Sequence, residues 1–388
     1  MIRFSRRSLS VCGEKGESRG RGFGVRRKTT AKWCVPRRAP QFAMVGTMIL
    51  AAVFFVAGCD PTSLSSDPAV PVATVERGMT LLWGPEIKEE ALQMIQQSTV
   101  FCHLTMYELG DQDLLDSLRK AKQRGVDVKI ILDASEPHSQ TIALPFLRKY
   151  HIPVSLLTIP GGISHIKSLV TENSTGLHAL MGGMNFGPYS WENHDASVYI
   201  DHAETGFEGL FQQDAARANG WPEANVAYPL PLLYDGQIEP AMLEAIAGAK
   251  HTVDVEAFAL TSRDFLTALE TAAARGVTVR VLLDAKQSYN HRSAARLLRA
   301  GISVKYYTPY QGEYLHAKIV NIDQGRILFV GSANFSYHGF SVNHEGDLEL
   351  TFVPRMGSVV ASDFNTQWGR GGDVAASASG QYGSSATY

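Results

Sequence analysis

The sequence predicts an α/β fold in which the same strand–helix–strand block occurs twice. Strand-like and helix-like segments alternate from about residue 80 onward. Two aspartates that close strand-like runs, Asp133 and Asp284, lie 151 positions apart, and so do two histidines, His165 and His316. A constant offset that is shared by structural segments and by polar residues indicates an internal duplication.

The first block has four elements. Apolar residues at helical spacing predict helices over 86–97 and 113–124. Runs rich in β-branched and aromatic residues predict strands within 99–109 and 125–135. The second of these strands is apolar almost throughout, which is typical of a buried parallel strand.

The same order recurs in the second block, with helices predicted over 238–250 and 264–275 and strands within 252–260 and 276–286. Pro and Asn are frequent between the blocks, which predicts a connector over 218–229. The predicted domains are therefore 79–217 and 230–369, followed by a Gly/Ser/Ala-rich tail, 370–388, that we expect to be disordered.

Residues 1–58 read as an export signal. A basic stretch precedes an apolar core over 44–57 that is short for a membrane span. The tetrapeptide that ends in Cys59, Val-Ala-Gly-Cys, resembles a bacterial lipobox, in which the cysteine is lipidated. Residues 59–78 then form a predicted tether. A plain signal peptide or an uncleaved anchor, with Cys59 incidental, is the alternative.

The net charge of −2 averages two different regions. Residues 1–58 hold 12 Lys and Arg against 2 acids, whereas residues 59–388 hold 24 Lys and Arg against 36 acids. An acidic body disfavours nucleic acid as a partner. Of the four cysteines, only Cys102 would remain free in the mature chain, in an apolar run, so we expect a buried residue and no intramolecular disulfide.

Each block is followed by the same series of polar residues. In a strand, alternation places the His and the Lys of His-x-Lys on one face. There the lysine and an asparagine can hold phosphate oxygens while the imidazole approaches phosphorus, and we expect the later acid of each repeat to accept the other ring N–H. The series comprises His165, Lys167, Glu172, Asn185 and Asp195 in the first repeat, and His316, Lys318, Asp323, Asn334 and Glu345 in the second.

This constellation resembles the phospholipase D superfamily, whose signature is HxKxxxxD followed by G-[ST]-x-N, present twice per active site. The second repeat matches in full and includes Ser332. The first repeat has Glu172 in place of Asp and Gly183 in place of Ser or Thr. We expect the first copy to be functional, with one phosphate contact loosened by the missing hydroxyl.

The resemblance implies two duplicated α/β/α sandwich domains with mixed sheets, related by a pseudo-twofold axis, with the active site at their interface. It implies a ping-pong reaction in which His165 is the nucleophile and His316 the general acid. The groups that would contact the phosphate are the side chains of Lys167, Lys318, Asn185, Asn334 and Ser332. Glu172 and Asp323 would be structural partners, and no metal or other cofactor is implied.

Other residues at corresponding positions have less definite roles. His194 and His344 precede the later acids and could pack beside them. Tyr107 and Phe258, also 151 apart, are predicted to face the core or line a cleft. Asp133 and Asp284 are expected to close their strands.

The favoured function is a phosphodiesterase of the phospholipase D type. It would cleave or transfer the phosphatidyl group of phospholipids through a phosphohistidine, with cardiolipin-synthase-like activity included. The chain would be a monomer with an internal pseudo-dimer, lipid-anchored to the bacterial cell membrane or outer membrane outside the cytoplasm. The alternatives are a metal-independent endonuclease of the same superfamily and a non-catalytic surface binding protein. Intact His and Lys in both repeats argue against the last.

Overall fold

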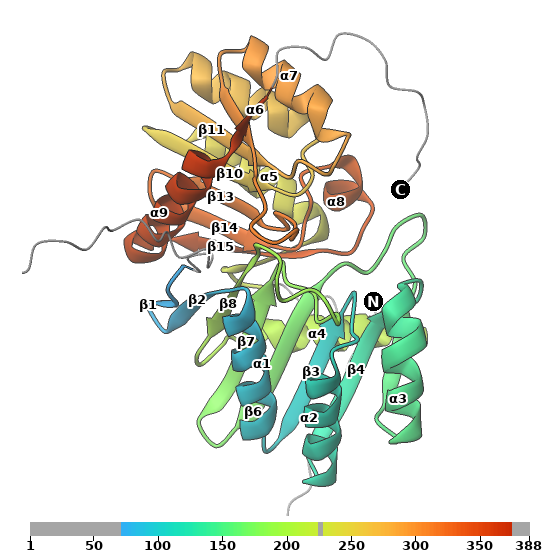
Figure 1. Ribbon diagram of the computed structural model, residues 1–388. Helices are drawn as coiled ribbons and strands as arrows, with labels where there is room; N and C mark the ends of the chain where they lie inside the picture. Colours follow the sequence, from blue (N-terminus) through green and yellow to red (C-terminus); the bar gives the residue numbers. More distant parts are fainter. Residues whose placement is uncertain (1–70, 224–227, 375–388) are drawn as a thin grey trace, which may run out of the picture. The chain divides into compact units, whose positions relative to one another are not determined.

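The computed structural model describes residues 71–223 and 228–374 (Figure 1). The predicted export signal and Cys59 lie outside these residues. Each repeat forms one eight-stranded mixed sheet, in the order β1-β2-β8-β7-β6-β3-β4-β5 for the first and β16-β12-β11-β10-β13-β14-β15-β9 for the second. The predicted duplicated α/β fold is confirmed.

The elements of the first repeat reproduce the predicted helices and strands and add others around them. They are β1 (Thr74–Glu76), β2 (Met79–Trp83), α1 (Pro85–Gln97), β3 (Phe101–Met106), α2 (Gln112–Gln123), β4 (Asp127–Asp133), a π-helical turn (Ser139–Ala143), α3 (Leu144–Lys149), β5 (Val154–Leu157), β6 (Lys167–Asn173), β7 (Gly176–Gly182), β8 (Ala196–Ile200) and α4 (Gly206–Asn219).

The second repeat has the same plan. Its elements are β9 (Leu232–Tyr234), a 3₁₀ turn (Asp235–Gln237), α5 (Ile238–Ala247), β10 (Thr252–Ala257), α6 (Arg263–Ala274), β11 (Thr278–Leu283), α7 (Asn290–Arg299), β12 (Ser303–Tyr306), β13 (Lys318–Ile322), β14 (Ile327–Gly331), α8 (Tyr337–Ser341), β15 (Gly346–Thr351), α9 (Pro354–Arg370) and β16 (Gly372–Asp373).

Polar side chains start equivalent helices in the two repeats. The Asp111 carboxylate accepts the backbone N–H groups of Asp113 and Leu114 at the start of α2. The Ser262 hydroxyl, 151 residues later, accepts the N–H of Phe265 at the start of α6. Such caps satisfy N–H groups that have no partner inside the helix.

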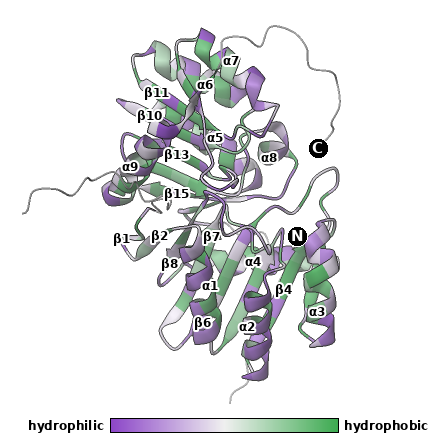
Figure 2. Cartoon of the chain, viewed as in Figure 1, coloured by the Kyte–Doolittle hydropathy of each residue, from purple (hydrophilic) through white to green (hydrophobic). Residues whose placement is uncertain are grey.

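Each sheet is covered by helices on both faces (Figure 1). Strands β3, β4 and β5 run parallel, as do β10, β11 and β12. Successive residues of β4 serve opposite faces: Ile130 packs in the core beneath α1, α2 and α3, whereas Ile131 packs with Phe211 of α4. This alternation explains why the strand is apolar throughout. Figure 2 shows the hydrophobic colour concentrated on the strands and the hydrophilic colour on outer helices such as α2.

One hydrophobic core contains side chains of both repeats. It combines buried residues of the first sheet, such as Val170 and Met181, with residues of the second sheet, such as Leu328 and Leu348. Strands β7 and β8 of the first sheet contact β14 and β15 of the second, and the burial of these apolar side chains stabilises the contact between the repeats.

The structure corrects the predicted limits of the domains. Strand β1 lies within the predicted tether and pairs with β2, and its Glu76 carboxylate accepts the N–H groups of Arg355 and Met356 at 3.0 and 3.1 Å. Strand β16 lies within the predicted disordered tail and pairs with β12. Backbone pairing at the sheet edges orders these short polar segments, which sequence composition does not show.

Two observations bear on the membrane and on the cysteines. Among residues 71–223 and 228–374, no helix has both the length and the apolar character that a bilayer span requires. Cys102 is fully buried in β3, and burial raises the pKa of its thiol to about 12. The prediction that Cys102 is buried is confirmed.

Candidate active site

The two His-x-Lys motifs begin in short segments whose backbones form hydrogen bonds with the opposite repeat. His165 and His316 precede β6 and β13, and the bridges Ser164–His344 and His194–Leu315 join each segment to the opposite repeat. The backbone N–H of His165 donates to the His344 carbonyl at 2.8 Å, and that of His316 donates to the His194 carbonyl at 2.9 Å. Each His-x-Lys therefore lies beside the Asn-His-acid segment of the other repeat.

The supporting acids are exchanged between the repeats. His165 Nδ1 lies 2.9 Å from Glu345 Oε2, and His316 Nδ1 lies 2.6 Å from Asp195 Oδ2. The prediction that each histidine uses the acid of its own repeat is wrong. The backbone bridges bring the opposite acid against each imidazole, so sequence order within a repeat does not decide the partner.

The lysines and two aromatic rings surround the histidines in matched pairs. Lys167 Nζ donates to the His165 carbonyl at 2.5 Å, and Lys318 Nζ donates to the His316 carbonyl. Tyr107 lies 5.0 Å from the His165 ring, and Phe258 lies 5.0 Å from the His316 ring. Each ammonium lies 5.3 Å from the centroid of its aromatic neighbour. The two aromatic residues therefore line the site and pack against its histidine and lysine side chains.

Burial dominates the protonation of the site. Burial, with Lys167 and Lys318 nearby, lowers the pKa of His165 well below 6.5, and burial with Lys318 lowers the pKa of His316 to about 4. Burial also lowers the pKa of Lys167 to about 7 and that of Lys318 to about 8. The protein surroundings alone thus favour two neutral imidazoles, and an anion bound beside them would raise these pKa values.

The two supporting acids differ in charge. Burial raises the pKa of Glu345 to about 7, with the two lysines opposing it only in part. Burial also acts to raise the pKa of Asp195, but His316 and Lys318 outweigh it and lower that pKa below its usual value. The acid behind His316 is therefore the more fully ionised of the two.

Ser332 is reassigned by its contacts. Its hydroxyl is fully buried, donates to Glu345 Oε2 at 2.6 Å and accepts the N–H of Gly346 at 3.0 Å. It therefore supports the acid behind His165 and is not free to contact a phosphate. Asn185 and Asn334, by contrast, keep buried carboxamide oxygens without a hydrogen-bond partner among the described residues, as side chains reserved for a ligand would.

The structure explains why the first repeat has glycine at position 183, where the family signature has Ser or Thr. A Cβ at this position would lie 2.2 Å from Asp195 Oδ1, so only glycine leaves room for that carboxylate. The first repeat thus combines Gly183 with Asp195, and the second combines Ser332 with the longer Glu345. The missing hydroxyl reflects the packing of the acid and not a loosened phosphate contact.

The acids that close the two signatures are peripheral. The Asp323 carboxylate accepts the backbone N–H groups of Lys250, His251 and Thr252, and so fixes the connection into β10. At Glu172 it is the backbone carbonyl that accepts two N–H groups, from the residues that lead into β3, and the side chain is half-buried. The expected structural role is seen for Asp323, while Glu172 contributes through its main chain.

Asp133 and Asp284 do more than close their strands. Asp133 Oδ2 accepts the N–H of Ser164 at 2.7 Å, and Asp284 Oδ2 accepts the N–H of Leu315 at 2.9 Å. Each aspartate therefore fixes the residue directly before a histidine of the site. Their shared offset of 151 was the signal that paired them.

His194 and His344 lie behind the site, and each contacts two carboxylates. The four partners were missed from the sequence, because each of them comes from a different element of the chain. The only signal was a spacing of 149 between two aspartates on corresponding helices. The partners are Glu256 and Asp363 for His194, and Asp214 and Asp235 for His344.

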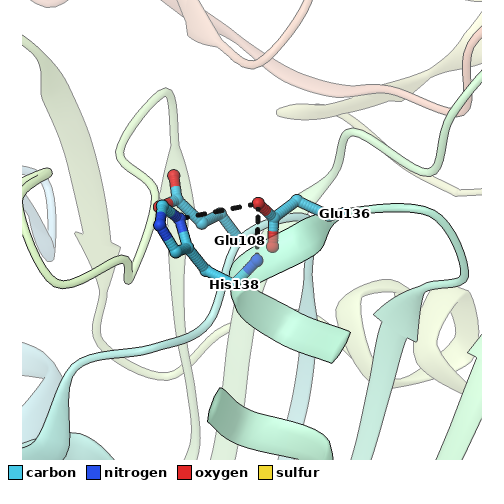
Figure 3. Close-up of side chains that lie close together, drawn as sticks. All are labelled: Glu108, Glu136 and His138. Carbon is cyan, nitrogen blue, oxygen red and sulfur yellow. Dashed lines mark hydrogen bonds and ion pairs between the residues drawn. The ribbon is translucent and has the colours of Figure 1, made fainter. Parts of the chain in front are cut away.

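A further cluster lies beside the first repeat's strand ends and consists of Glu108, Glu136 and His138 (Figure 3). His138 Nδ1 lies 2.7 Å from Glu108 Oε1. The Glu136 carboxylate accepts the backbone N–H groups of His138 and Ser139 at 3.1 and 2.6 Å. These groups satisfy one another, and Glu136 caps the adjoining helical turn, so the geometry assigns no metal here. Likewise the two carboxylates beside His194 both face its Nε2 as ion-pair partners.

The chain matches the protein family described as "Cardiolipin synthase, PLD-like domain" at residues 91–214 and again at 242–368. It is 25% identical to the cardiolipin synthase of Halalkalibacterium halodurans over 348 residues, which cover 76% of this chain and 66% of that protein. It is 26% identical to the cardiolipin synthase of a Geobacillus species over 344 residues, 75% and 66% of the two chains. The chain therefore spans 66% of the length of these two relatives.

Solved structures share the fold. The phosphatidylserine synthase of Haemophilus influenzae aligns with a TM-score of 0.59 at 14% identity, over 76% of this chain and 88% of that one. The polyphosphate kinase of Porphyromonas gingivalis aligns with a TM-score of 0.57 at 14% identity, over 80% and 52%. Since the family matches each repeat once, and the matched residues cover most of the chain, this protein belongs to the PLD-like domain family of cardiolipin synthases.

Proposed function

We propose that this protein is a phosphodiesterase of the phospholipase D type that transfers the phosphatidyl group of a phospholipid to an alcohol, or to water. The observation that carries the proposal is the paired site, in which two histidines, each beside a buried lysine, have their imidazoles held by a carboxylate of the opposite repeat. Relatives named cardiolipin synthase support a phospholipid substrate and transfer to an alcohol.

In the first step His165 Nε2 attacks phosphorus. The new N–P bond replaces the bond to the leaving alcohol, which takes a proton from His316. The unequal acids support this assignment: the ionised Asp195 stabilises a protonated His316, and the less ionised Glu345 leaves His165 neutral. The negative charge of the bound diester favours the proton on His316.

In the second step the roles reverse. The acceptor alcohol, or water, gives its proton to His316 and attacks phosphorus, and the N–P bond breaks to restore His165. Lys167, Lys318 and the two buried carboxamides would contact the non-bridging oxygens, where charge increases in the transition state.

The test uses purified full-length chain in EDTA, incubated with vesicles of phosphatidylglycerol and separately with plasmid DNA. We expect glycerol release and formation of cardiolipin, and loss of both in His165→Ala and in His316→Ala. Full activity in either variant would contradict a shared site. Nicking of DNA without glycerol release would identify an endonuclease instead.

We also propose that the protein is exported and anchored outside the cytoplasm through a lipid on Cys59. The support is the apolar segment 44–57, which ends two residues before this cysteine, and the lipobox-like tetrapeptide that the cysteine completes. Cys59→Ala should move the protein from the membrane fraction to the soluble fraction, whereas Cys34→Ala, in the predicted signal, should leave it in place. Membrane association that persists in Cys59→Ala would count against lipidation.

A further inference from the structure

The two repeats differ at one backbone position in otherwise matching surroundings. Gly84 comes directly after β2 and Asp235 directly after β9, with φ of 47° and 48°. The N–H of Gly84 donates to the Asp195 carbonyl at 3.2 Å, and the N–H of Asp235 donates to the Glu345 carbonyl at 3.1 Å. The two positions are therefore structurally equivalent, although one has a carboxylate and the other has no side chain.

In the second repeat the carboxylate of Asp235 occupies the space beside His344. One oxygen, Oδ1, lies 2.8 Å from His344 Nδ1 and accepts the N–H of Glu345 at 3.0 Å. The other ring nitrogen, Nε2, lies 2.8 Å from Asp214. This buried imidazole thus has a carboxylate at each nitrogen.

In the first repeat the equivalent imidazole has carboxylates on one side only. His194 Nε2 lies 3.0 Å from Asp363, the counterpart of Asp214, and 3.1 Å from Glu256. Its Nδ1 corresponds to the His344 nitrogen that Asp235 contacts in the second repeat, and His194 and Gly84 line the same space. Within residues 71–223 and 228–374, neither this nitrogen nor the N–H of Asp195 has a hydrogen-bond acceptor, so two donors face the same space.

That space is a cavity of about 180 Å³, which we call the His194 cavity. Aromatic side chains form much of its wall, and Trp83 and Tyr307 lie 5.3 and 5.5 Å from the imidazole ring. An apolar cavity of about 150 Å³ in another protein holds benzene. The His194 cavity therefore has room for a small organic molecule. Its lining includes Trp83, Gly84, Trp191, His194, Asp195 and Tyr307.

The charges around the cavity select one class of ligand. Burial opposes a charged imidazole, but Asp363 and Glu256 raise the pKa of His194 well above 6.5, and burial raises the pKa of Glu256 to about 7. A bound carboxylate with a proton on Glu256 would restore the balance of the second repeat, one imidazolium between two carboxylates. Glu192 and Glu313 also line the cavity and disfavour a dianion such as phosphate.

We propose that the His194 cavity binds a small organic monocarboxylate, which accepts from His194 Nδ1 and the Asp195 N–H as the side chain of Asp235 does in the second repeat. The apolar part of the ligand packs against the aromatic wall. This site is separate from the phosphodiester site of the proposed function. It contacts that site through His194, whose backbone carbonyl accepts the N–H of His316, and through Asp195, whose carboxylate holds the His316 ring.

Butyrate is a suitable probe, since it has as many non-hydrogen atoms as benzene, and 1-butanol is the matched uncharged probe. Binding to the full-length chain is followed by ligand-observed NMR at pH 6 and pH 8. We expect saturable butyrate binding that is tighter at pH 6, because it takes up a proton, and at least tenfold weaker binding of 1-butanol.

Two variants of one residue separate filling of the cavity from backbone strain. Gly84→Asp places a carboxylate where the ligand would bind, and should abolish butyrate binding. Gly84→Ala has the same backbone strain and adds only a Cβ at 3.4 Å from the Trp191 carbonyl, so it should retain binding. Asp235→Gly opens the equivalent space beside His344 and should add a second butyrate site.

The readout is binding and not turnover, so the result stands apart from the proposed catalytic activity. The proposal is overturned if the wild-type chain shows no saturable binding of butyrate, if 1-butanol binds equally well, or if Gly84→Asp binds butyrate like the wild type. If Gly84→Asp does not fold, the Asp235→Gly arm decides: no gain of butyrate binding there would overturn the proposal.

Discussion

The exchange of acids between the repeats leads to a sharp prediction for Asp195→Asn. Asparagine keeps the shape and one acceptor oxygen, but removes the charge that stabilises a protonated His316 across the 2.6 Å contact. A hydrogen bond to a charged group contributes about 1.5–3 kcal/mol. At about 1.4 kcal/mol per factor of ten, kcat for phosphatidylglycerol should fall about 10- to 150-fold.

Asp195→Asn and Glu345→Gln should slow different steps of the reaction, because each acid supports a different histidine. Asp195 belongs to the first repeat but serves His316, the proposed general acid. An activated phosphatidyl ester of p-nitrophenol needs no protonation of its leaving group, so Asp195→Asn should release a stoichiometric burst of p-nitrophenol and then turn over slowly. Glu345→Gln, which weakens the support of His165, should show no fast burst.

Rapid-mixing absorbance at the p-nitrophenolate band, together with steady-state kcat and KM for phosphatidylglycerol, checks this prediction. Glu192→Gln, an exposed acid in the same segment, is the matched control and should keep wild-type kinetics. A burst in Glu345→Gln but not in Asp195→Asn would reverse the roles of the histidines. Wild-type turnover in Asp195→Asn would refute the idea that the exchanged acids support catalysis.

Three further predictions concern stability. The carboxylate partners of His344 outweigh burial and raise its pKa to about 10, above an unfolded value near 6.5, so its contribution is complete below about pH 6.5 and lost as pH rises through about 10. His344→Gln should therefore flatten the decline of Tm over that window. Gly183→Ser would place a Cβ 2.2 Å from Asp195 Oδ1, and should cost about 1–3 kcal/mol of unfolding free energy by overpacking. Asp323→Ala leaves three backbone N–H groups without their acceptor and should cost about 1–3 kcal/mol, whereas Glu172→Ala should stay within about 0.5 kcal/mol.

Thermal and urea unfolding across pH measure these effects, and each has its own contrary result. His202→Gln, in which an exposed histidine is replaced, should leave the dependence of Tm on pH unchanged. If His202→Gln and His344→Gln change this dependence equally, the effect does not come from the buried ion pairs of His344. A Gly183→Ser variant as stable as wild type would show that Asp195 can move aside. Equal losses for Asp323 and Glu172 would contradict the difference in their contacts.

Much of the fold was predictable because its signals are local and occur twice. Hydrophobic periodicity gives the strands and helices directly, and the repeated offset joins them into two copies. The predictions were wrong at the edges, where β1 and β16 lie in segments whose composition is that of a tether or a tail. A strand at a sheet edge is held mainly by backbone hydrogen bonds, and those leave little trace in side-chain composition.

The candidate site divides in the same way. The sequence by itself determined which residue types form the candidate site, because His-x-Lys, the asparagine and the later acid recur in a constant order. Tertiary structure alone decided that Glu345 serves His165 and Asp195 serves His316. It also assigned Ser332 to an acid. These pairings depend on where segments distant in the chain meet, since a side chain interacts with groups within a few ångströms of it, whatever their distance along the sequence.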